Sequence, residues 1–278
     1  MYKNFLIQSL QININYYIEC YHNLKTLYNN DSVHDFRVSI RKLMSLLNLI
    51  DEINKFAVIQ QINETLKIQI KSFNKLRDIQ VQLEDIKNKI LAMPELSIYN
   101  SELFAIEQKF LFKLKNKLNK FEVIEIQNKI IILQKNINGF FNDNYDIYDS
   151  VYKVTHNTYQ NLINKIELSN ESEISTIHKV RLSLKNFRYI IEIIQGYTRL
   201  SKIDIKKLRY FQNLLGDIQD NCVFESSLKK FILKMKLNEN NYEKVFEYIY
   251  NVQNRLIKEY IENKNVLIDF WQNELFVM

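Results

Sequence analysis

Hydrophobic residues recur every three or four positions along almost the whole chain, which is the spacing of one face of an α-helix. The pattern predicts long helices joined by short polar segments. Met93 and Pro94 interrupt it, and the polar segment 139–144 is the best candidate for a boundary between two halves of the chain. The predicted helices span residues 5–28, 32–48, 53–91, 101–120, 121–138, 147–168, 177–196, 203–237 and 242–270.

The composition indicates an all-α protein. The 278 residues include only three Gly and one Pro, whereas sheets need many Gly-rich turns. The 46% hydrophobic content is enough for one large core or two moderate ones. No uninterrupted apolar run of about 18 residues could form a transmembrane helix, and the first residues lack the pattern of a signal peptide. Because Cys20 and Cys222 form no disulfide framework, we expect a cytoplasmic protein.

One predicted helix, residues 177–196, carries a narrow stripe of cationic side chains beside its apolar face. At about 100° per residue, the residues of this stripe are His178, Arg181, Lys185, Arg188 and Tyr189. Like charges at these spacings destabilise an isolated helix by roughly 0.2–0.5 kcal/mol per pair. A bound polyanion would offset this repulsion. For one such helix taken alone, a solvated basic face is the alternative interpretation.

A second copy of this pattern lies 144 residues earlier in the chain, within residues 33–48. Apolar positions match as well as polar ones. Two positions depart, because Met44 and Ser45 stand where the second copy has Arg188 and Tyr189. The matched polar pairs are His34 with His178, Arg37 with Arg181, Ser39 with Ser183 and Arg41 with Lys185.

The next helix repeats too, since the segment 66–81 resembles the segment 208–223 at nearly the same offset. In this pairing Asp78 matches Asp220, and both are expected to be charge partners that hold the basic helices. The same alignment pairs Lys67 with Arg209 and Asn74 with Gly216. Two recurrences at nearly one offset argue for an internal duplication. We therefore predict two similar helical bundles, residues 1–140 and 141–278.

Arginine is used selectively in this basic chain. The net charge is +6, and four of the eight arginines lie in the two matched helices although the chain has 30 lysines. The planar guanidinium binds phosphate or carboxylate in a forked manner and stays charged when partly buried. The distribution therefore favours an anionic ligand at the two helices.

The motifs H-x-x-R-x-x-x-[RK] in both halves, with L-R-D-I-Q-V and L-L-G-D-I-Q-D after them, resemble the CHAD family, the conserved histidine α-helical domain. The resemblance implies one all-α domain over 1–278, built from two pseudo-symmetric four-helix bundles around a basic groove or pore. It also implies binding of inorganic polyphosphate and location on polyphosphate granules. The residues that match the family's binding positions are His34, Arg37, Arg41, Lys42, His178, Arg181, Lys185, Arg188 and Tyr189, with Lys67 and Arg209 matching less securely.

Other functions are less favoured by the sequence. The two motif histidines are surrounded by Arg and Lys, which repel a metal cation. No nucleophile and base pair, metal cluster or phosphate loop indicates an enzyme or a cofactor. A nucleic-acid-binding helical protein is the stronger alternative, although few residues in the stripes could read base edges. A scaffold for an acidic protein partner is a third interpretation.

Overall fold

The computed structural model describes residues 2–141, 147–195 and 202–270, and every regular element in these ranges is helical. This confirms the all-α fold class predicted from the scarcity of Gly and Pro. In chain order the elements are α1 (Tyr2–Leu27), α2 (Asn30–Ile53), α3 (Ala57–Lys87), the short 3-10 helix η1 (Pro94–Leu96), α4 (Ser97–Leu118), α5 (Val123–Phe140), α6 (Ile147–Glu167), α7 (Ile174–Ile194), α8 (Lys202–Met235), the 3-10 helix η3 (Glu239–Tyr242), α9 (Glu243–Asn263) and α10 (Asn265–Ile268).

Several predicted helix boundaries differ from the observed ones. The helix expected from residue 101 begins at Ser97, because η1 starts at Pro94 and continues directly into α4. The helix expected over 242–270 is divided at Lys264 into α9 and α10. The expected C-cap at Gly196 and residues 142–144 of the expected boundary lie outside the described residues, while Gly139 belongs to α5.

The start of α2 also corrects a prediction. Its N-cap is Asn29, whose Oδ1 accepts a hydrogen bond from the Ser32 backbone N–H at 2.9 Å, while Ser32 Oγ accepts from the Asn29 N–H at 3.1 Å. This reciprocal pair is a capping box. In the sequence, Ser32 and Asp35 form a similar capping pattern, but the cap lies three residues before Ser32. Because α2 begins earlier, His34 lies beyond the unbonded N–H groups of the first turn, which therefore do not add to an anion site at His34.

The chain forms two compact units, and α3, α4, α6 and α7 each contribute residues to both. Among the described residues, unit 1 comprises 2–77, 110–141, 147–158 and 189–195, and unit 2 comprises 78–109, 159–188 and 202–270. The units are defined by packing and the two repeats by sequence, so they do not coincide. The division of one domain into repeats 1–140 and 141–278 stays a prediction.

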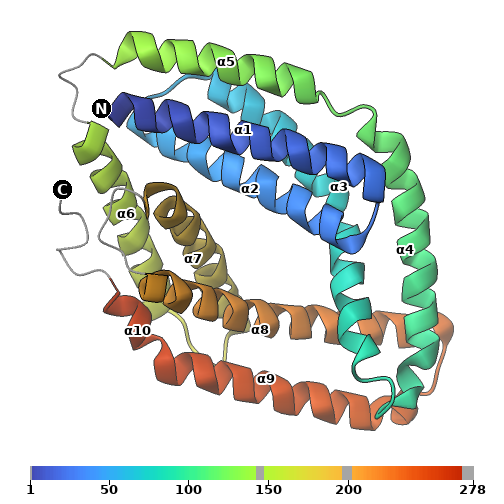
Figure 1. Ribbon diagram of the computed structural model, residues 1–278. Helices are drawn as coiled ribbons and strands as arrows, with labels where there is room; N and C mark the ends of the chain where they lie inside the picture. The colour runs from blue at the N-terminus through green and yellow to red at the C-terminus, as the bar shows by residue number, and fades with distance from the viewer. Residues whose placement is uncertain (1, 142–146, 196–201, 271–278) are drawn as a thin grey trace. The chain divides into compact units, whose positions relative to one another are not determined.

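Unit 1 is built around α1, which lies alongside α2 and α5 (Figure 1). The ring of Phe36 in α2 packs at centroid distances of 5.3 Å from Tyr17 in α1 and 5.5 Å from Phe73 in α3. Gln134 Nε2 in α5 donates to the carbonyl of Ile7 in α1 at 3.2 Å. Aromatic burial contributes much of the packing energy of such a core, so these contacts hold α2 in place.

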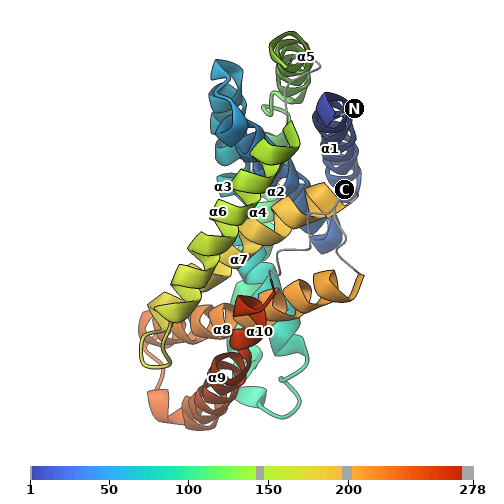
Figure 2. The ribbon, with the colours of Figure 1, turned by 90° about the vertical axis from the view of Figure 1, so that its left-hand side faces the viewer.

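Unit 2 is built around the pair α8 and α9, which run side by side in both ribbon views (Figures 1 and 2). Asn221 of α8 joins the two helices, because its Nδ2 donates to the Ile249 carbonyl of α9 at 3.0 Å. Phe187 of α7 packs against Tyr159 at 5.3 Å between ring centroids. The ring contact fixes the side of α7 that carries Phe187.

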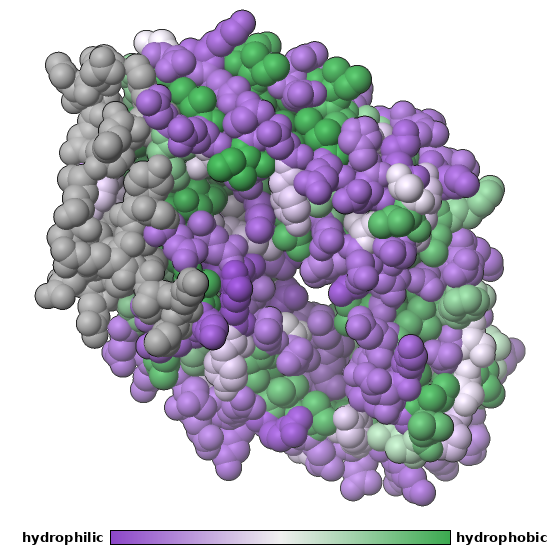
Figure 3. Space-filling model, viewed as in Figure 1, coloured by the Kyte–Doolittle hydropathy of each residue, from purple (hydrophilic) through white to green (hydrophobic). Residues whose placement is uncertain are grey.

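The surface mixes apolar and polar residues. Figure 3 shows hydrophobic residues interspersed with hydrophilic ones over the part of the surface formed by α5 and α1. Ile124 on α5 is 73% exposed, whereas Ile126 and Ile130 are buried, so only one side of this helix faces the core. None of the described helices combines the length and apolarity that a membrane crossing requires.

The capping box yields a stability prediction. Replacing Asn29 by Ala removes the acceptor of the Ser32 N–H, which should lower the free energy of unfolding by about 1 kcal/mol. Thermal unfolding followed by circular dichroism measures the change. Asn30→Ala, at the first residue of α2, is the control and should leave stability nearly unchanged. Equal losses in the two variants would contradict the assignment of Asn29 as the cap.

Candidate functional site

The position of the basic residues on α2 follows from what the helix buries. Phe36 and Ile40 are fully buried in unit 1, and the cationic residues lie on the adjoining side of the helix. His34 is exposed and Arg41 is partly exposed, whereas Arg37 is only 8% exposed. The three cationic residues therefore share one side of α2 but differ in how much they offer to a ligand.

Two hydrogen bonds fix the register of α2 against α3. Arg37 Nη1 donates to Asn74 Oδ1 at 2.8 Å, and Asn63 Nδ2 donates to Asn48 Oδ1 at 3.0 Å. Asn48 lies eleven positions after Arg37 along α2, and Asn63 lies eleven positions before Asn74 along α3. The two helices therefore run antiparallel in a single register over this length. Asn74, which the sequence marked as a departure from Gly, thus orients Arg37.

This register explains the environment of His34. Continuing it by three residues places His34 opposite Arg77 of α3. Partial burial lowers the pKa of the imidazole, and the positive charge of Arg77 lowers it further. Arg37 and Arg41 act in the same direction, while Asp35 opposes them. Several positive charges therefore gather around His34 within unit 1.

The same register gives a partner position for Met44, the residue that replaces an arginine of the second copy. Four residues before Asn48 on α2 is Met44, and four residues after Asn63 on α3 is Lys67. Lys67 is exposed, so an ammonium group stands on α3 at the level where α2 lacks a cation. The α2 cluster, as we name it, comprises His34, Arg37, Arg41, Lys67 and Arg77.

Lys42 does not belong to this cluster. It falls about 80° from His34 around α2, and its Nζ lies 5.4 Å from the centroid of the Tyr16 ring. With Tyr189 and Glu192 it lines a pocket of about 240 Å³ in unit 1. The structure thus brings together two predicted binding residues, Lys42 and Tyr189, but next to a carboxylate. Tyr189 is only 5% exposed, which limits its contact with a ligand.

The second basic helix is α7, of which residues 174–188 belong to unit 2. Val180, Leu184 and Phe187 are fully buried, and the basic residues lie beside this apolar face as predicted. The α7 stripe, as we name it, comprises His178, Arg181, Lys185 and Arg188. The first three of these residues are partly exposed.

Arg188 is held much as Arg37 is held, by an amide of the following helix. Its side chain is 9% exposed, and its Nε donates to Gln212 Oε1 of α8 at 2.5 Å. Nearer the start of α7, His178 Nδ1 is buried without a hydrogen-bond partner among the described residues. Arg209, the predicted counterpart of Lys67, is exposed on α8. The α7 stripe therefore combines one fixed guanidinium with more accessible cations.

The chemistry of both arrangements is anion binding. Amide oxygens orient the guanidinium groups of Arg37 and Arg188. Guanidinium groups remain charged at any physiological pH and bind phosphate or carboxylate in a forked manner. In the part of the chain that the structure describes, no three His, Cys, Asp or Glu side chains could together hold a metal ion. The groove shared by both helices would need residues of both units, and it stays a prediction.

Comparison with known proteins identifies the family. The family description of the CHAD domain matches residues 20–229, which include both basic helices and most of α8. The chain belongs to the CHAD domain family. A solved structure described as the CHAD domain from the plant Ricinus communis has a TM-score of 0.70 at 15% sequence identity. The similarity covers 96% of this chain and 89% of the plant chain. Among curated proteins no sequence matches.

Three contributors to these sites were missed or assigned otherwise by sequence reasoning. Arg77 was not among the predicted binding residues, although its charge acts on His34. Asn74 and Gln212 orient arginines from the following helices. The spacing of Asn74 and Arg77, three residues apart on one helix face, was a usable signal. The register that gives this spacing its meaning was absent from the sequence pattern.

The proximity of Arg77 and His34 can be tested by titration. Arg77→Gln removes a positive charge that disfavours the imidazolium, so the pKa of His34 should rise. An NMR titration of the His34 ring protons measures it. Lys75→Gln is the control, because it removes the same charge from α3. Lys75 Nζ lies over the Phe110 ring, 5.9 Å from its centroid, so the pKa of His34 should rise less in this variant. A pKa that rises equally in both variants would contradict the register of α2 and α3.

Proposed function

We propose that this CHAD domain binds inorganic polyphosphate, without catalysis, through the α2 cluster and the α7 stripe. The observation that carries the proposal is the gathering of Arg37, Arg41 and Arg77 around His34, where their charges lower the pKa of the imidazole. Such a concentration of like charge is relieved when an anion binds. Binding should therefore raise the pKa of His34 and draw protons from solution.

The linear arrangement of the cations favours a linear anion. Seven residues separate His34 from Arg41 along α2, which corresponds to roughly 10 Å of helix. Lys67 extends the row by about another turn at the level of Met44. A single phosphate would engage only part of this row, whereas a chain with roughly one charge per phosphate would engage all of it. The affinity of such a chain should fall steeply with salt concentration.

The side chains favour polyphosphate over nucleic acid. Proteins that bind single-stranded nucleic acid usually stack bases on accessible aromatic rings. Tyr189 is the tyrosine predicted for the second basic helix, and it is buried. The Tyr16 ring lies under the Lys42 ammonium. The other alternative is a scaffold for an acidic protein partner, whose carboxylates would bind the basic residues in place of phosphates. Binding experiments distinguish this alternative from polyphosphate binding.

In the cell, this activity corresponds to a cytoplasmic protein on polyphosphate granules. The support is the family membership together with the basic clusters on α2 and α7. A fusion with a fluorescent protein should concentrate on granules, and its localisation should disappear in cells that lack polyphosphate.

A competition experiment tests the function. Labelled long-chain polyphosphate is bound to the full chain, and unlabelled polyphosphate, single-stranded RNA or polyglutamate is added at equal charge concentration and fixed salt. We expect polyphosphate to displace the label at a concentration at least tenfold lower than the other two polymers. If RNA or polyglutamate displaces it equally well, the proposed specificity is wrong.

Variants of α7 test the residues. Arg181→Ala combined with Arg188→Ala should weaken polyphosphate binding by well over tenfold, since a charged hydrogen bond contributes roughly 1.5–3 kcal/mol. Lys113→Ala combined with Lys117→Ala is the matched control, because it removes the same charge from exposed positions of α4. Fluorescence anisotropy gives both affinities, and circular dichroism shows that each variant keeps its helices. Equal affinities of the two folded variants would contradict the assignment.

A further inference from the structure

A pocket of opposite character lies wholly within unit 2, where the end of α3 meets α8 and α9. Its volume is about 270 Å³, which suits a small ligand. Three carboxylates line it, those of Asp85, Asp217 and Asp220. Partial burial raises the pKa of Asp217, and the neighbouring charges of Asp220, Asp85 and Glu259 raise it further. The lining also includes two cationic residues, Lys89 and Arg255, so carboxylates outnumber cations by three to two.

The pocket already holds one ammonium group, that of Lys89. The Nζ atom of Lys89 lies 2.5 Å from Asp85 Oδ2. It also stands over two aromatic rings, 5.3 Å from the centroid of Phe224 and 5.0 Å from that of Tyr248. A carboxylate and two ring faces are the groups that recognise organic cations in proteins. The contacts of the Lys89 ammonium therefore show how the lining could bind the amine of a ligand.

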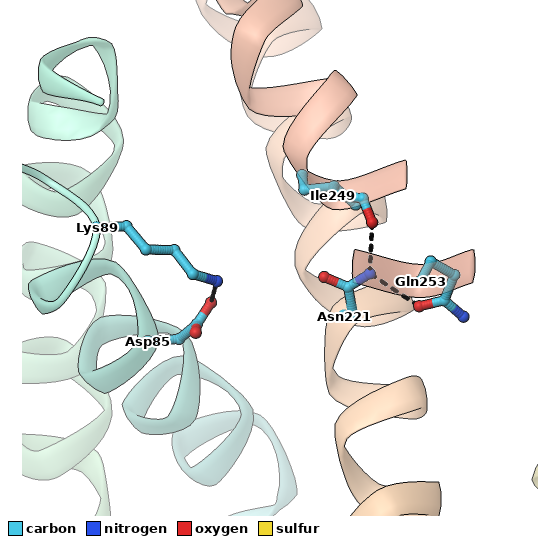
Figure 4. A network of polar contacts seen from close by, with 5 residues as sticks. All are labelled: Asp85, Lys89, Asn221, Ile249 and Gln253. Carbon is cyan, nitrogen blue, oxygen red and sulfur yellow. Dashed lines mark hydrogen bonds and ion pairs between the residues drawn. The ribbon is translucent and has the colours of Figure 1, made fainter. Parts of the chain in front are cut away.

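The amide oxygen of Asn221 adds an acceptor to this lining. Asn221 is 9% exposed, and its Nδ2 donates to the Ile249 carbonyl at 3.0 Å and to Gln253 Oε1 at 2.8 Å. These two bonds fix the amide plane, so that Oδ1 points away from α9 and towards the side on which Asp85 and Lys89 lie (Figure 4). No described residue donates a hydrogen bond to this Oδ1. An amide oxygen accepts hydrogen bonds, so a ligand N–H group in the pocket could donate to it.

The chemistry of the lining selects the class of ligand. Within the described residues no set of three metal-ligating side chains is placed to hold a metal ion, which argues against a divalent cation. Asp217 and Asn221 are four residues apart on α8 and therefore lie on one helix face. We propose that the pocket binds a short aliphatic polyamine, with one ammonium group between the Asp217 carboxylate and Asn221 Oδ1. This site is independent of the proposed polyphosphate binding, because no member of the α2 cluster or α7 stripe lines it.

Isothermal titration calorimetry of the full chain with spermidine tests this site. We expect saturable binding of one spermidine per chain, weakened about tenfold by Asp217→Asn, since the lost interaction is a charged hydrogen bond. Glu225→Gln is the matched control, because it removes the same charge from α8 outside the pocket. The control should bind spermidine as the wild type does. Equal weakening in both variants would show nonspecific attraction to negative charge and would overturn the proposal.

A second variant gives a change in the opposite direction. Lys89→Gln removes the ammonium group that occupies Asp85 and the two rings, so spermidine should bind several-fold more tightly. Affinity that stays equal or falls would show that Lys89 does not compete for an amine position, which contradicts the proposal. A last experiment adds magnesium chloride at equal charge. If magnesium displaces spermidine from the wild type but not from Asp217→Asn, the pocket is a metal site and the assignment of a polyamine is overturned.

Discussion

The hydrogen bond between Arg37 and Asn74 sets the arrangement of cations in unit 1, because it fixes how α2 lies against α3. With the Asn63 to Asn48 bond it defines one antiparallel register. The proximity of Arg77 to His34 follows from that register, and so does the position of Lys67 opposite the gap at Met44. The buried aromatic ring of Phe36 supplies the packing that holds the two helices together. Core packing therefore determines where the charges stand.

Each copy of the basic helix has one arginine that donates to a side-chain amide of the following helix, but this arginine stands at a different position in each copy. In α2 the fixed arginine is Arg37, near the start of the motif, and in α7 it is Arg188, near its end. In each case an amide of the following helix orients a largely buried guanidinium. Fixing the plane of the guanidinium orients the forked donors that bind phosphate or carboxylate. The crowded carboxylates of unit 2 line a separate pocket.

Helix positions, the all-α class and the family could be predicted from this sequence, because they depend on local periodicity and on motifs such as the one beginning at His178. Other features depend on contacts between helices. The cap at Asn29 was missed because Ser32 and Asp35 offered a similar capping pattern. Lys67 was predicted as a less secure binding residue, but its position opposite Met44 could not be predicted, because it follows from a register that periodicity does not encode. The side on which Lys42 lies could have been calculated from helix geometry.

A crystal structure of the full chain with a short polyphosphate chain bound tests polyphosphate binding by α2 and α7 most directly. We expect a row of phosphates along α2, contacting His34, Arg41 and Lys67, with Arg37 still bonded to Asn74. We also expect phosphates along the exposed part of the α7 stripe. Phosphates bound instead to the exposed lysines of α4, such as Lys113 and Lys117, with none on either basic helix, would contradict the central claim.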